Sequence, residues 1–201
     1  MKEKLILGLF LGAGVLLAQH AGGGAPMSTP ASAQPGMNNP NNPLNGGNMP
    51  SSTTAKVDDK RFAQEAAMGG MMQIQAAKLA EQQSSNVSIK QYAQKMINDH
   101  TKADDQLQQV ASKDSLTLPD KLDAKQQGTL DKLAKLSGPA FDKAYAKDMV
   151  KDHERDVNAF RAESESGANP DVKQFAAQTL PVLEQHLDSA KTLEKSVKKG
   201  Q

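Results

Sequence analysis

The chain of 201 residues is long enough for one ordinary domain and an additional segment. It carries 24 basic and 23 acidic residues, 3% aromatic residues, and neither Trp nor Cys. Balanced charge gives no electrostatic footprint for nucleic acid. The absence of Cys excludes disulfides, thiolate nucleophiles and Cys-based metal sites. Low aromatic content disfavours a β-sandwich core, so an all-α protein is expected.

Residues 1–21 have the pattern of an export signal peptide. Met1–Lys4 is a short charged segment, and Leu5–Leu17 is an apolar run too short to span a bilayer comfortably. Small residues follow at Ala18 and Ala21, so cleavage is expected after one of these two positions. Retention of the run as an N-terminal anchor is the alternative. No Cys follows it, which excludes a lipoprotein anchor. The sequence therefore predicts an exported protein.

Residues 22–56 are rich in Gly, Pro and Asn and contain six of the ten prolines. Lys56 is the only charged residue in this segment. Such a composition buries too little apolar surface to offset the entropy of ordering the chain. We therefore predict a disordered linker. It offers a means of association with the cell envelope or cell wall, and the sequence indicates no particular protein partner.

Residues 57–201 have the pattern of a helical bundle. Helix-capping residues precede apolar runs at Asp58, Asn86 and Asn169, and Ser137 is a further expected cap. Pro139 and Pro170 are placed in the tolerated first turn of their helices. The predicted long helices span 58–84, 86–113, 139–166 and 171–199, with a short crossover helix over 124–136.

The second long helix has the most regular apolar seam, with spacings that alternate between four and three residues. Its members are Ile89, Ala93, Met96, His100, Ala103, Leu107 and Val110. The segment Ile89–Ala93 is echoed by Val172–Ala176, which suggests two similar helical hairpins. Two hairpins joined by one long crossover form a ferritin-like four-helix bundle. The Gly69-Gly70 pair in the first helix predicts close approach of a partner helix.

A short motif occurs twice and identifies the candidate site. Met96–His100 and Met149–His153 both read Met-(Ile/Val)-x-Asp-His, and His186 holds the equivalent place in the last helix. Gln73, His100, His153 and His186 each lie near the middle of a predicted helix and on its apolar seam. Because packed helices of similar length have their midpoints at similar depth, these four residues should converge. Met96 and Met149 lie one turn before the first two histidines, on the same faces.

The residues leave three interpretations of this cluster open. The favoured one is a buried polar layer in which the histidines hydrogen-bond to one another, to Gln73 and to water, and set helix register in a non-catalytic protein. The alternative is a metal site in which the three imidazoles, the sulfur of Met96 and Met149, and Gln73 bind copper or another transition metal. A ferritin-like oxidoreductase is the least favoured, because Glu-x-x-His is absent: Ile97, Val150 and Leu183 stand three residues before the histidines. No phosphate loop, nucleophile elbow or zinc-protease motif occurs.

Over about Phe62–Leu193 the sequence resembles the DUF4142 family, bacterial proteins of unknown function described as predicted outer-membrane or periplasmic proteins. The residues that carry the resemblance are Gly69-Gly70, Lys90–Ala93 with Asp99-His100, Leu136–Gly138 with Phe141-Asp142 and Tyr145, Met149–His153, and Leu180-Pro181 with His186. The resemblance implies a ferritin-like fold, a periplasmic or outer-membrane location and no established activity; a role in stress is a further expectation. Gln73 stands where the family would have Glu, which disfavours a carboxylate-based metal centre.

Overall fold

The computed structural model describes residues 57–200, which belong to one compact unit spanning Pro50–Gln201. The predicted signal peptide, its cleavage positions and the whole predicted linker lie outside the described residues. Five α-helices and no strand occur within 57–200: α1 Asp59–Gln83, α2 Val87–Asp114, α3 Ala124–Leu133, α4 Gly138–Ser166 and α5 Pro170–Lys198. The all-α prediction is confirmed. None of these helices has the length and hydrophobicity needed to span a membrane.

The helix ends follow from the capping residues. Asp58 accepts a hydrogen bond from the Arg61 N–H at 3.1 Å, while Asn86 and Asn169 each accept two from the first turn of α2 and α5. Ser137 has the extended backbone of a cap, but its side chain makes no capping hydrogen bond. The predicted crossover helix is three residues too long, because Ala134–Leu136 form a tight turn with hydrogen bonds of the i to i+3 type.

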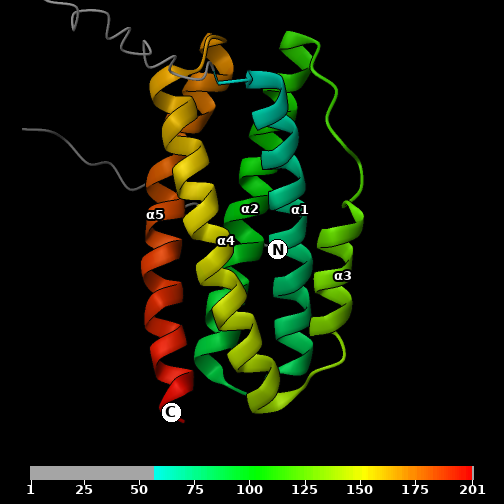
Figure 1. Cartoon of the computed structure of the whole chain (residues 1–201), viewed down its shortest axis with the longest axis vertical. Coiled ribbons are helices and arrows are strands. Elements are labelled where there is room, and N and C mark those ends of the chain that lie inside the picture. Colours follow the sequence, from blue (N-terminus) through cyan, green and yellow to red (C-terminus); the bar gives the residue numbers. More distant parts are fainter. Residues whose placement is uncertain (1–56, 201) are drawn as a thin grey trace, which may run out of the picture. The chain divides into compact units, whose positions relative to one another are not determined.

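The four long helices form the predicted ferritin-like bundle (Figure 1). α1 packs against α2 and α4, and α5 packs against the same two helices, so α1 and α5 are diagonal to one another. α1 and α2 form one antiparallel hairpin, and α4 and α5 form the other. The connection from α2 to α4 passes along the bundle and contains α3, which lies against α1. One long crossover between two hairpins is the connectivity expected of this fold.

The bundle core consists of two apolar clusters. The first includes Met72, Met96, Phe141, Tyr145 and Met149, and the second includes Phe62, Leu107, Val157, Phe160 and Phe175. On α2, α4 and α5 a histidine stands between the residues of one cluster and those of the other: His100, His153 and His186. A polar layer therefore interrupts the core.

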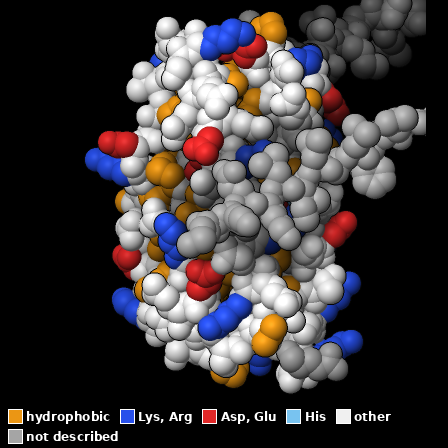
Figure 2. Space-filling view, turned by 180° about the vertical axis from the view of Figure 1, so that it is seen from behind, with side chains coloured by type: hydrophobic (Ala, Val, Ile, Leu, Met, Phe, Trp, Pro, Cys, Tyr) orange, Lys and Arg blue, Asp and Glu red, His pale blue; other side chains and the backbone are white. Residues whose placement is uncertain are grey.

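Acidic and basic side chains are interspersed over the face of the bundle shown in Figure 2. No histidine is visible on the part of that face that described residues form. This mixed surface agrees with the balanced charge of the sequence and has no single-sign patch of the kind that would steer a charged macromolecule.

Candidate metal centre

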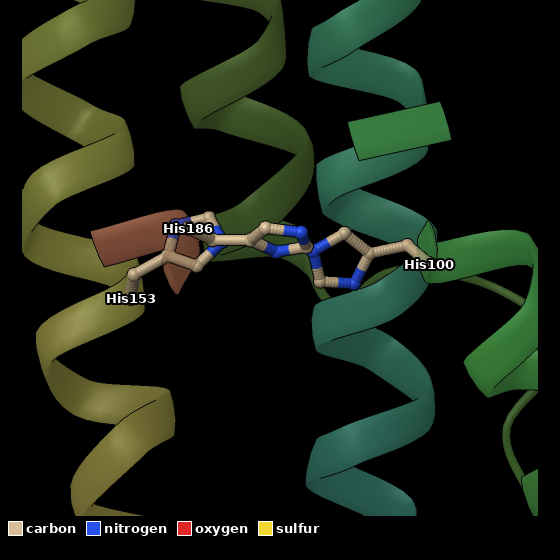
Figure 3. A group of neighbouring side chains, drawn as sticks. All are labelled: His100, His153 and His186. Carbon is tan, nitrogen blue, oxygen red and sulfur yellow. The ribbon is translucent and has the colours of Figure 1, made fainter. Parts of the chain in front are cut away.

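Three helices direct one histidine each toward a common point in the polar layer. The rings of His100 from α2, His153 from α4 and His186 from α5 point toward one another (Figure 3). Their ring centroids are 5.7 Å apart for His100 and His153, and 5.4 Å apart for each of the other two pairs. One nitrogen from each ring lies within 4.8 Å of the others. The predicted convergence of the histidines is confirmed.

The three imidazoles are excluded from solvent, with exposed fractions of 6% for His100, 0% for His153 and 1% for His186. Burial disfavours the charged imidazolium and lowers the pKa of His153 and of His186 to about 4. Burial, followed by the neighbouring His153 and His186, lowers the pKa of His100 well below its ordinary value. All three side chains are therefore neutral at pH 7, which is the form that binds metal ions.

Hydrogen bonds fix which nitrogen carries the proton in two of the rings. His153 Nδ1 lies 2.8 Å from the backbone oxygen of Met149, and His186 Nε2 lies 2.8 Å from Oδ2 of Asp99. A carbonyl only accepts, and Asp99 is ionised because hydrogen bonds from Lys95 and His186 outweigh burial and lower the pKa of its carboxyl. Both ring nitrogens must therefore donate. The lone pairs are left on His153 Nε2 and His186 Nδ1.

These two lone-pair nitrogens, together with His100 Nε2, are buried and have no hydrogen-bond partner among the described residues. The predicted hydrogen bonds among the histidines are therefore wrong, since no ring nitrogen bonds to another ring. A first-row metal ion binds imidazole nitrogen at about 2.0–2.1 Å, so its ligand nitrogens lie roughly 3–4 Å apart. Small side-chain movements would bring the three nitrogens of this cluster to that spacing.

The profile of the family described as "Domain of unknown function (DUF4142)" matches residues 46–193. The chain belongs to the DUF4142 family. A DUF305 protein from Streptomyces coelicolor has a similar structure, with a TM-score of 0.59 and 14% identity over 69% of this chain and 91% of that chain. A DUF305 fragment from Deinococcus radiodurans gives a TM-score of 0.60 and 11% identity over 70% of this chain and 95% of that chain. At these identities the likeness shows the fold alone. No curated protein gives a significant match.

Gln73, which replaces the Glu expected for a DUF4142 protein, is fully buried in α1. Both atoms of its side-chain amide are buried without a hydrogen-bond partner among the described residues. The predicted hydrogen bonds between Gln73 and the histidines are therefore also wrong. Convergence of Gln73 with the histidines stays a prediction.

Met96 and Met149 are fully buried in the first apolar cluster. Met149 takes part in the centre through its backbone oxygen, which orients His153. Coordination by the sulfur of Met96 or Met149 stays a prediction.

Sequence reasoning missed the contribution of Asp99 to the centre and the neighbour of Gly70. Asp99 of α2 orients His186 of α5, although the two residues are far apart in the chain. The signal was available, because Asp precedes His in both copies of the motif. Asp104 packs against Gly70, where a Cβ atom would lie 2.9 Å from Asp104 Cγ. The glycine thus makes room for a carboxyl side chain of α2 rather than for a helix backbone.

Proposed function

We propose that this DUF4142 protein binds one late first-row transition-metal ion at His100, His153 and His186. The observation that carries the proposal is the orientation of the rings. Two of them donate their outer N–H to a carboxylate or a backbone carbonyl and turn the remaining lone pair inward. Metal-binding histidines are held in this way, because the outer hydrogen bond fixes the tautomer and increases the basicity of the ligand.

The donor set favours copper or zinc. Neutral imidazole suits Zn, Cu, Fe and Ni, and a site of given ligands binds Cu²⁺ most tightly among the divalent first-row ions. A magnesium or calcium site would require several oxygen ligands. Binding by Met96 or Met149 would add soft sulfur ligands and would favour Cu(I). Gln73 is the candidate for a fourth ligand or for a hydrogen bond to one.

We further propose that the protein acts outside the cytoplasm. Support comes from the signal-like residues 1–21 and from the Streptomyces coelicolor neighbour, which is described as a candidate secreted protein. Cleavage after Ala18 or Ala21 and a location in the periplasm or at the outer membrane belong to this proposal. Intact-mass measurement of protein from the periplasmic fraction tests it, and retention of residues 1–17 there would contradict the cleavage.

Metal titration of the untagged chain tests the proposed site. We expect Cu²⁺ and Zn²⁺ each to bind with a stoichiometry of one and to raise the melting temperature, because a ligand specific for the folded state stabilises it. Removing a group that only orients a metal ligand weakens metal affinity by about 10–100-fold. Removing a ligand should weaken it more, so we expect a larger loss of affinity in His100→Gln, His153→Gln or His186→Gln. His20→Gln, measured in the full chain that keeps residues 1–21, is the control and should leave binding unchanged.

Absence of saturable binding, or binding that survives all three substitutions, would contradict the metal site. The polar layer would then serve to set helix register. In that case the same substitutions should lower the free energy of unfolding by about 1–3 kcal/mol whether or not metal is present.

A further inference from the structure

The histidines are enclosed by four helices, so an ion must cross the packed bundle to reach them. Two cavities share wall residues of α1 and α4. The inner cavity has a volume of about 20 Å³, and its walls include Gly70, His100, Asp104, Asp156 and Thr179. This volume is sufficient for about one water molecule. His100 thus belongs both to the candidate metal centre and to the wall of this cavity.

The outer cavity, of about 260 Å³, lies between α1, α4 and the beginning of α3, and its walls include Glu65, Asp123 and Arg155. Ala66, Asp156 and Phe160 line the outer and the inner cavity alike. These three residues therefore stand between the two spaces. Ala66 has the smallest side chain of the three, which makes it the point at which added volume would obstruct passage.

The residues between the outer cavity and His100 have the chemistry needed to pass a cation. Asp156 and Asp104 provide carboxyl groups in succession, and the missing side chain of Gly70 leaves the space in which Asp104 lies. Burial and then the neighbouring Asp105 raise the pKa of Asp104 to about 7, so this group is a carboxylate above that pH. Thr179 adds a hydroxyl oxygen that is buried without a partner among the described residues. Oxygen ligands at successive positions replace the waters of an ion as it leaves bulk solvent.

On the outer side, Arg155 pairs with Asp156 through Nη2 and Oδ1 at 3.0 Å and also bonds to Asp152 at 3.2 Å. The Arg155 side chain is more than half exposed, with 56% of its surface accessible. The carboxyl partners are less accessible, at 16% for Asp156 and 15% for Asp152, so the Arg155 end of these pairs is the one that faces solvent. Arg155 therefore places a positive charge at the outer end of the acidic route.

We infer that metal ions reach the three histidines from the α1–α4 side, through the outer cavity, past Asp156 and then Asp104. The inference rests on the proposed function, since it describes how the same site is loaded. It assigns Asp104 and Asp156 to ion transfer and Arg155 to the control of access. None of these residues is required to hold the bound ion.

Stopped-flow mixing of the full chain with Cu²⁺, followed by its absorbance, tests the route. Ala66→Leu should slow association and dissociation by the same factor and leave Kd unchanged, because a narrower passage affects both directions equally. The dissociation rate is obtained by mixing the copper-loaded chain with excess chelator and extrapolating the observed rate of copper release to zero chelator concentration. Ala177→Leu places the same change at an exposed position of α5, away from both cavities, and should alter neither rate.

Charge variants provide a second test that does not depend on how Ala66→Leu folds. Asp104→Asn and Asp156→Asn should slow association by roughly 10-fold at low ionic strength, the lower end of electrostatic steering effects. Arg155→Gln should speed association, and added salt should reduce all three effects. Asp105→Asn, which removes an exposed charge beside Asp104, is the matched control.

Stoichiometric binding with wild-type rates in Ala66→Leu, Asp104→Asn and Asp156→Asn would overturn the route and leave the metal site standing. Failure of the wild-type chain to bind Cu²⁺ or Zn²⁺ would overturn the metal site and, with it, the route.

Discussion

Asp99→Asn separates a metal centre from a structural polar layer, because it changes the charge beside His186 while keeping an oxygen that can accept the same hydrogen bond. The Asp99 carboxylate accepts from His186 Nε2 at 2.8 Å and from Lys95 Nζ at 2.6 Å. Its side chain is 31% exposed, so its contribution to the stability of the metal-free protein is screened by solvent. We expect the free energy of unfolding without metal to change by less than about 1 kcal/mol.

The effect on metal affinity should be larger. A carboxylate that accepts from a metal-binding imidazole makes the opposite ring nitrogen a stronger ligand, and its loss weakens binding by about 10–100-fold. That range corresponds to about 1.4–2.8 kcal/mol of binding free energy. Titration against a competing chelator measures the affinity directly. Urea denaturation at fixed excess metal should show the same loss, since the stabilisation by a ligand depends on its concentration relative to Kd.

Asp152→Asn is the matched control, since Asp152 holds the same motif position in α4 but pairs with Arg155 rather than with a histidine. It should leave equilibrium metal affinity unchanged. Equal affinities for Asp99→Asn and the wild type would refute the proposed role of the Asp99–His186 pair. Equal losses in the two variants would indicate a general effect of charge instead.

Two further predictions concern stability and are tested by urea denaturation. Gly69→Ala should stabilise the fold by about 1 kcal/mol because its Cβ would lie 3.9 Å from Asp156 Oδ2, an ordinary contact, and because Ala is the better helix former. Gly70→Ala should destabilise it by about 1 kcal/mol or more, since Asp104 must move; equal effects at the two glycines would contradict this assignment. Burial and then the neighbouring Asp59 raise the pKa of Glu163 from 4.5 to about 7. The protonated side chain is therefore favoured in the folded state, and its contribution to the free energy of unfolding is highest below pH 4.5 and falls as pH rises through 7. Glu163→Gln should therefore exceed the wild type in stability by about 1–3 kcal/mol at about pH 8 and match it at about pH 4, and a constant difference between these pH values would contradict the prediction.

The fold could be predicted because its determinants are local. Asp58, Asn86 and Asn169 mark helix starts through side-chain oxygens that satisfy free N–H groups of the first turn. The regular seam of α2 fixes which face is buried. Convergence of the histidines followed from the same two facts, because residues at the middle of adjacent helices must meet if their seams face one another.

The details of the site depend on how the helices are rotated and paired, which spacing within one helix does not specify. Asp99 and Asp152 occupy the same motif position, yet one reaches across to His186 on α5 and the other pairs with Arg155 on its own helix. The contact between Gly70 and Asp104 could not be predicted, because it depends on which residue of α2 faces Gly70 in the packed bundle. The unused atoms of Gln73 were likewise hidden, since the sequence indicates burial but not hydrogen-bond partners.

One nitrogen of each histidine in the polar layer is buried without a partner among the described residues, and so are both amide atoms of Gln73 in α1. Each such atom costs about 1–3 kcal/mol if nothing binds it, and the total is then comparable with the 5–15 kcal/mol stability of a typical domain. A ligand bound at these atoms should therefore stabilise the folded state. Hydrogen bonds to Met149 and Asp99 hold two rings with their lone pairs inward, so those nitrogens can accept but cannot donate to one another. The proposed metal ion would accept the lone pairs of the three imidazoles at once, so its binding should appear as folding stability.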